Sequence, residues 1–200
     1  MTEGESKAWE RLLKAAPDTI CKNALAQFDV EANCYIIKSF GIEFIVSLKD
    51  AVITSTMKGS EALLNRPSMY YMFTVLWYLF CAKDISLSGS LVRPEDISGG
   101  QLFIQGSHIL PLKDITNRYN NDIERFIDKA MTLNGEKTGY GDASIRLFPF
   151  PKIPVEMILW RGDEEFQAKA SLLFDSTCER HLPVDVLWSI AMMSINLILG

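Results

Sequence analysis

This chain has few histidines, no closely spaced cysteines and no cluster of positive charge. It contains two histidines and four cysteines, and no two cysteines form a CxxC pair. Structural zinc and iron–sulfur sites usually draw ligands from such pairs, so no metal framework of this kind is expected. The 20 basic residues are scattered among 25 acidic ones, and the net charge is −5. Because nucleic-acid-binding proteins normally present a basic patch or stripe, no nucleic-acid partner is expected.

Apolar runs of membrane-spanning length are lacking too. Met69–Ala82 is one apolar run, and Val184–Leu199 is another that includes Asp185 and Asn196. A membrane span needs about 20 apolar residues, so both segments are predicted to be buried helices. The N-terminal residues 1–16 are charged and amphipathic, without the apolar core of a signal peptide. We therefore expect a cytoplasmic protein with reduced thiols and no membrane span.

The order of periodic segments predicts an α+β protein. Helical spacing of apolar residues occurs in 9–16, 21–28, 68–82, 111–132 and the C-terminal segment, whereas 34–37, 44–48 and 52–56 alternate as in an antiparallel meander. Residues 145–148, 155–160 and 168–174 are predicted to be further strands, and the glycine-bearing segments 86–100 and 134–141 to be loops. We predict one domain, residues 1–200, with an antiparallel sheet of about five or six strands packed against the 68–82 helix and the C-terminal helix.

The densest group of acidic residues directly follows the predicted strand that ends at Trp160. It is Gly162–Phe166, which contains Asp163, Glu164 and Glu165. One interpretation is a hairpin turn, in which the glycine can take a positive φ and the aspartate side chain accepts backbone hydrogen bonds. The other is a site where carboxylates at a strand end bind a cation or act as acid and base. The sequence leaves both interpretations open.

A second candidate site is the glycine-bearing stretch 98–108. The amides around Gly100, Gly106 and Ser107 are placed to cradle an anion ahead of the following predicted helix. The spacing matches neither a P-loop nor a dinucleotide-binding fingerprint. The alternative is a loop whose apolar residues pack on the core. His108 makes the stretch a candidate for proton donation or ligand binding.

The other histidine, His181, lies three residues after Cys178. On a helix the two side chains would share a face, as a nucleophile and its base or as half of a metal site. The alternative is that His181 caps or packs beside the proline that follows. Asp175 ends the last predicted strand, where an aspartate commonly stabilises a turn. Arg146, inside another strand, should point away from the core or toward an acid of the 162–166 turn.

Two stretches carry a resemblance to a known family. One runs from Gly99 to Pro111, and the other from Trp160 through Asp175 to Asp185. In residue order and spacing they are similar to a family of bacterial and archaeal proteins known as a domain of unknown function, DUF3786, and the similarity covers nearly the whole chain. Some members carry an iron–sulfur module and occur in anaerobes, so the resemblance implies a role beside redox or corrinoid proteins. The four cysteines of this chain do not supply such a cluster.

Two classes of function follow from these patterns. The first is an accessory module that binds a small ligand or a partner protein, and the apolar C-terminus also suggests a homodimer. The second is an enzyme in which carboxylates of Gly162–Phe166 and Asp175 act with His108 or His181 as the acid–base group, which must lie within hydrogen-bond reach of an acid. The ligand and any cofactor are not identified, and no metal is expected. The candidate ligand-binding residues are Gly100, Gly106, Ser107, His108, Trp160, Asp163, Glu164, Glu165, Asp175 and His181.

Overall fold

The N-terminal part of the chain forms a small antiparallel sheet between helices. The computed structural model describes residues 3–65 and 68–200. This part contains α1 (Glu3–Lys14), α2 (Pro17–Ala24), β1 (Gln27–Asp29), β2 (Cys34–Ser39), β3 (Ile42–Ser47), β4 (Val52–Thr54), α3 (Glu61–Leu64) and α4 (Ser68–Cys81). The strands pair in the order β1-β2-β3-β4, each antiparallel to the next. The predicted meander is confirmed, and β1 extends it by one strand.

The C-terminal part builds a larger antiparallel sheet in the order β5-β9-β8-β7-β6. Its elements are β5 (Leu91–Val92), the 3-10 turns η1 (Pro94–Asp96), η2 (Gly100–Ile104) and η3 (Gly106–His108), α5 (Leu112–Tyr119), α6 (Ile123–Thr132), β6 (Glu136–Thr138), β7 (Ala143–Phe150), β8 (Ile153–Trp160), β9 (Lys169–Asp175), α7 (Cys178–His181) and α8 (Val184–Leu199). The almost continuously apolar β8 is the central strand, as a strand buried on both faces should be.

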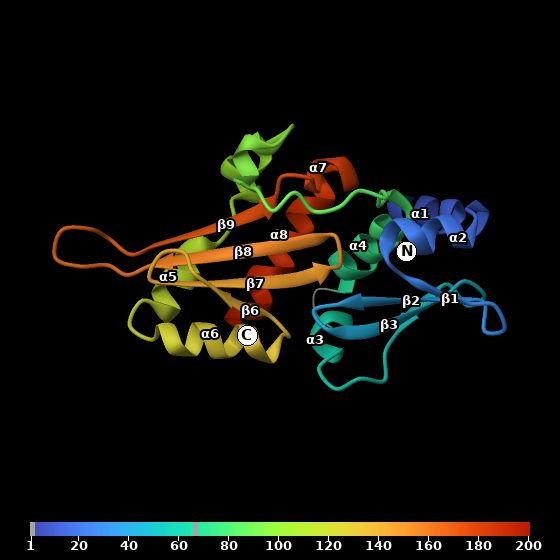
Figure 1. Ribbon diagram of the computed structural model, residues 1–200, viewed down its shortest axis with the longest axis horizontal. Coiled ribbons are helices and arrows are strands. Elements are labelled where there is room, and N and C mark those ends of the chain that lie inside the picture. The colour runs from blue at the N-terminus through green and yellow to red at the C-terminus, as the bar shows by residue number, and fades with distance from the viewer. Residues whose placement is uncertain (1–2, 66–67) are drawn as a thin grey trace.

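Helices α4 and α8 pack together at the centre of the molecule. Figure 1 shows α8 behind the larger sheet and α4 between α8 and the N-terminal helices. The Tyr78 ring stacks on Phe150 of β7 with ring centroids 4.4 Å apart, and its hydroxyl donates to the carbonyl of Ala24 at 2.9 Å. One cluster of buried apolar side chains joins both sheets. Within the described ranges, no helix is long and apolar enough to cross a bilayer.

The prediction of a single sheet of five or six strands is wrong in its count. The described residues form two sheets, of four and five strands. Strands β1, β5 and β6 have only two or three residues each, and the last two lie inside segments for which the glycines predict loops. Such short strands are stabilised by backbone hydrogen bonds to a neighbouring strand. Two or three residues are too few to show the alternating pattern by which a strand is recognised in a sequence.

Two predicted helices also have different bounds in the structure. The helix expected over 21–28 is α2, which ends at Ala24 because Leu25 takes a left-handed conformation with φ of 53°. The helix expected over 111–132 is divided into α5 and α6. The division occurs where the Asp122 carboxylate accepts a hydrogen bond from the amide of Arg125 (3.1 Å) and starts a new helix. As a result α5 packs separately, against β9.

Candidate functional site

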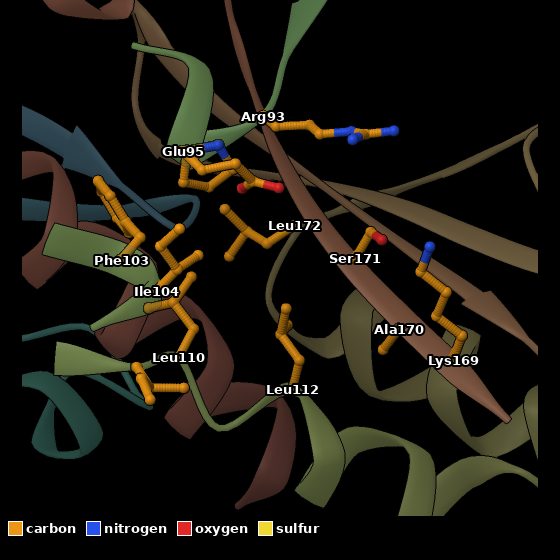
Figure 2. Close-up of a pocket in the computed structure, with 12 residues that line it drawn as sticks. Arg93, Glu95, Phe103, Ile104, Leu110, Leu112, Lys169, Ala170, Ser171 and Leu172 are labelled. Carbon is orange, nitrogen blue, oxygen red and sulfur yellow. The ribbon is translucent and has the colours of Figure 1, made fainter. Parts of the chain in front are cut away.

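The two stretches that carry the family resemblance meet at a groove beside β9. Figure 2 shows the groove between β9 and the chain that contains the 3-10 turns. The first stretch contributes Phe103, Ile104, Ile109 and Leu110, and the second contributes the start of β9, residues 169–172. The groove has a volume of about 320 Å³. Residues far apart in sequence therefore form one surface feature, as a binding site requires.

The edge of β9 that faces this groove is open. β5 pairs with β9 only at Phe174 and Asp175, and the chain then turns away because Pro94 begins η1. In the part of the chain that the structure describes, no strand pairs with residues 169–173 on this side. Figure 1 shows β9 along the outer side of the larger sheet, next to the segment that carries the turns. The groove thus includes an unpaired strand edge.

The hydrogen bonds beside β5 show which backbone groups of β9 face outward. The amide of Ser176 donates to the carbonyl of Ser90 at 2.8 Å, on the β5 side of β9. Backbone groups alternate in direction along an antiparallel strand. The N–H and C=O groups of Ala170 and Leu172 therefore point the same way as those of Ser176, into the groove. Among the described residues these four groups have no hydrogen-bond partner outside the sheet ladder.

Strand β8 gives independent support for this assignment. The carbonyl of Leu159 accepts a hydrogen bond from the amide of Asp142, on the β7 side of β8. By the same alternation, the backbone groups of Ile158 face β9, where Ile158 is paired with Ser171. The N–H of Ser171 is therefore used inside the sheet. The neighbouring N–H of Ala170 is the one left free.

Apolar side chains form the floor of the groove. Phe103 and Leu172 are buried, whereas Ile104 and Ile109 are 50% and 58% exposed. A water-facing aliphatic side chain is common by itself, but here two of them border the same concave surface. The exposed apolar area therefore belongs to a shaped site that side chains of another molecule can fill.

Two cations stand at the rim of the groove. Arg93 and Lys169 are exposed, and in Figure 2 the charged ends of both side chains lie across the groove from Phe103. The Lys169 ammonium lies 5.6 Å from the ring centroid of Trp160, at the end of β8. Glu95 also lines the groove. The rim therefore carries more positive than negative charge, in a chain whose net charge is negative.

The glycines of the first stretch allow close packing of the 3-10 turns and a change in the direction of the chain. A Cβ on Gly100 would lie 2.1 Å from the carbonyl oxygen of Pro94, so glycine is needed for η2 to pack on η1. Gly106 has φ of 62°, a left-handed conformation, where the chain enters η3. Ser107 Oγ and His108 Nδ1 lie 3.4 Å apart in that turn. A direct role of these four residues in ligand binding remains a prediction.

The acidic stretch after β8 forms a tight turn. The Asp163 amide donates to the carbonyl of Phe166 (2.9 Å), and Asp163 Oδ1 accepts from the amides of Phe166 (2.7 Å) and Glu165 (2.9 Å). These hydrogen bonds lower the pKa of Asp163, and the one from Phe166 has the larger effect. The side chains of Glu164 and Glu165 are exposed. The turn interpretation accounts for this geometry, and the described ranges hold no group of three ligands suited to a metal ion.

Substitutions in this turn separate its structural role from a binding role. We expect Asp163→Ala to lower the melting temperature more than Glu165→Gln, because only Asp163 accepts backbone hydrogen bonds through its side chain. Thermal unfolding followed by circular dichroism measures the difference. Equal melting temperatures would contradict the structural role of Asp163. An unchanged melting temperature together with lost ligand binding would favour the site interpretation.

Asp175 fastens a loop to the end of β9. It is 4% exposed and accepts hydrogen bonds from Ser88 N (3.1 Å), Ser88 Oγ (3.0 Å), Gly89 N (2.8 Å), Thr177 N (3.0 Å) and Thr177 Oγ1 (2.7 Å). Burial by itself raises the pKa of Asp175, but these hydrogen bonds outweigh burial and lower the pKa. The loop at Ser88 leads into β5 and η1. Asp175 therefore positions one wall of the groove, and its role in ligand binding stays a prediction.

His181 and Cys178 share α7, and both are buried. His181 Nδ1 accepts from the amide of Lys83 at 3.2 Å, and Nε2 finds no partner in the described residues. Burial, followed by the charge of Lys152, lowers the pKa of His181. Burial raises the pKa of Cys178 to about 12. The His181 imidazole is therefore neutral and the Cys178 thiol protonated. This state does not favour a nucleophile–base pair.

Sequence reading missed a partly buried ion pair on the larger sheet. Arg146 Nε lies 3.0 Å from Glu156 Oε2, and the partner is therefore not an acid of the 162–166 turn. Burial raises the pKa of Glu156, against the effects of Thr138 and Arg146. The two residues are direct cross-strand neighbours in β7 and β8. The hairpin register was the signal that could have identified the pair.

Fold and groove together define an α+β protein with two antiparallel sheets, the larger of which has an open edge. The chain belongs to the DUF3786 family, described as a domain of unknown function, whose model matches residues 16–197. The resemblance predicted from the two stretches is thereby confirmed. No curated protein and no solved structure matches the chain. The family description carries no activity, so an association with anaerobic redox or corrinoid metabolism stays a prediction.

Proposed function

We propose that this chain is a cytoplasmic accessory module that binds an extended segment of a partner protein along the open edge of β9. The observation that carries the proposal is the unpaired backbone at Ala170 and Leu172, which faces a groove. An exposed strand edge offers N–H and C=O groups on which another chain can add as a strand. In this mode main-chain hydrogen bonds supply affinity, and pockets for alternate side chains supply specificity.

The groove indicates the chemistry of that segment. At about 3.3 Å per residue, the open edge from 169 to 172 accommodates about four residues. Alternate side chains of an added strand would enter the floor formed by Phe103 and Leu110. The remaining side chains would lie near Arg93 and Lys169, which attract acidic groups. We therefore expect the partner segment to alternate apolar and acidic residues.

The surroundings of the predicted acid–base groups favour binding over catalysis. Asp163 and Asp175 use their carboxylates to accept hydrogen bonds from backbone amides. Across residues 3–65 and 68–200, neither His108 nor His181 makes a hydrogen bond to a carboxylate. An acid–base mechanism requires that contact. All four cysteines are free, which fits the reducing cytoplasm.

Selection of short random peptides displayed against the purified protein tests the proposal. We expect the enriched peptides to alternate apolar and acidic residues. We also expect Ala170→Pro to weaken their binding about tenfold or more, since it removes a main-chain donor from the groove. Proline at this position removes no hydrogen bond between β8 and β9. Glu124→Gln, on the exposed side of α6, is the control and should bind as the wild type does.

Three results would overturn the proposal. In the first, selection enriches no peptide. In the second, the enriched peptides bind the wild type and Ala170→Pro equally well. In the third result, a second copy of this chain, and not a partner segment, occupies the open edge of β9. Analytical ultracentrifugation would then show a dimer that Ala170→Pro dissociates and Glu124→Gln does not.

A further inference from the structure

A second pocket lies between α4, α8 and the turns η2 and η3. Four aromatic side chains, those of Tyr70, Phe73, His108 and Trp188, line it together with Asp185. Its volume is about 300 Å³, at the lower end of the range for small-molecule sites. The pocket shares no lining residue with the groove beside β9. An inference from it therefore does not depend on the proposed function.

The rings of this pocket form walls that meet at steep angles. Trp188 is anchored by its Nε1, which donates to the carbonyl of His108 at 2.6 Å. The His108 ring lies 5.0 Å from the Trp188 ring at an angle of 71°, and the Tyr70 ring lies 5.7 Å away at 77°. Phe73 follows Tyr70 by three positions on α4 and adds another ring. Aromatic walls of this kind present π faces to a ligand.

Asp185 adds a negative charge to the aromatic walls. It precedes Trp188 by three positions on α8, so the two side chains lie on the same face of the helix. The Asp185 side chain is exposed at the mouth of the pocket that it lines. In the described part of the chain, no hydrogen bond or ion pair engages its carboxylate. An unpaired carboxylate beside aromatic faces complements a positively charged ligand.

We propose that this pocket binds a small organic cation with a methylated or quaternary ammonium group. Aromatic rings attract such a cation through their π electrons, and its methyl groups would contact the ring surfaces that line the pocket. A metal ion would need several oxygen ligands, whereas Asp185 is the one carboxylate among the lining residues. The charge and the apolar surface of a methylated ammonium group match both features of the pocket.

Calorimetric titration with tetramethylammonium and with choline tests this inference. The neutral comparison is 3,3-dimethylbutanol, which has the shape of choline but no charge. We expect saturable binding of both cations, and binding of the neutral analogue weaker by about tenfold or more. We expect Asp185→Asn and Tyr70→Leu to weaken binding of the cations about tenfold. Tyr70→Phe keeps the ring and should bind them as the wild type does.

Glu124→Gln is the matched charge control, because it removes one negative charge from an exposed position outside the pocket. We expect it to leave the affinity for both cations unchanged. Equal binding of choline and 3,3-dimethylbutanol would overturn the inference, as would equal losses in Asp185→Asn and Glu124→Gln. Absence of saturable binding to the wild type would overturn it too. The melting temperature of each variant shows that it is folded.

Discussion

Replacement of Asp175 with alanine is expected to destabilise the protein by about 3 kcal/mol or more. The variant removes the shared acceptor of the amides of Ser88, Gly89 and Thr177, at a position that is 4% exposed. The buried Thr177 amide left without a partner costs about 1–3 kcal/mol, and the more exposed amides of Ser88 and Gly89 lose their acceptor as well. Urea unfolding measures the loss. The loop that Asp175 holds also leads into the groove wall, so peptide binding should weaken as well.

Asp142→Ala is the matched control for this prediction. Asp142 is exposed, and its carboxylate accepts one hydrogen bond, from the amide of Arg161 at 2.7 Å. We expect a much smaller loss of stability from Asp142→Ala than from Asp175→Ala. Equal losses in the two variants, or a stable Asp175→Ala protein, would contradict the anchoring role of Asp175.

The stability contributed by Asp175 should also depend on pH. Folding lowers the pKa of Asp175, so its contribution is fully present above the unfolded-state pKa of about 3.9. The contribution is lost as the pH falls through the lower, folded-state pKa. The difference in unfolding free energy between wild type and Asp175→Ala should therefore narrow in acid. A difference that stays constant into that range would contradict the assignment.

Proline at two adjacent positions of β9 is expected to give opposite results. Ser171→Pro should destabilise the protein by about 3 kcal/mol, because the Ser171 N–H faces β8 and takes part in the ladder. Ala170→Pro should cost about 1 kcal/mol or less, because the Ala170 N–H faces the groove. Urea unfolding of both variants measures the contrast. Equal losses, or a greater loss in Ala170→Pro, would show that the assigned direction of the β9 backbone is wrong.

Local patterns in the sequence predicted the elements whose structure is determined locally. The apolar run at 155–160 predicted a buried strand, and the apolar helix at 68–82 lies in the core. The hairpin interpretation of Gly162–Phe166 needed only a glycine, an aspartate and two flanking strands. In each case the signal and the structure involve the same few residues.

The open edge of β9 could not be predicted in this way. It depends on which segment pairs with β9, and that segment is β5, two residues in a stretch with loop composition. The end of β5 at Pro94 leaves 169–173 unpaired, which no pattern within β9 itself records. Arg93 and Lys169 were missed as rim residues for the same reason.

The aromatic pocket illustrates a similar limit. His108 was a candidate because histidine is rare in this chain, and it does line a pocket. Tyr70 and Trp188 belong to strongly apolar helices, so their sequences suggested core packing. Their half-exposure depends on how α4, α8 and η3 meet, which is a property of tertiary packing.

Amide hydrogen exchange along β9, followed by NMR with and without a selected peptide, tests the central claim most directly. In the free protein, the amides of Ala170 and Leu172 should exchange rapidly, while those of Ser171 and Leu173 are protected by pairing with β8. Bound peptide should protect Ala170 and Leu172 as well. Rapid exchange at both amides in the presence of saturating peptide would show that the partner segment does not add to the edge of β9.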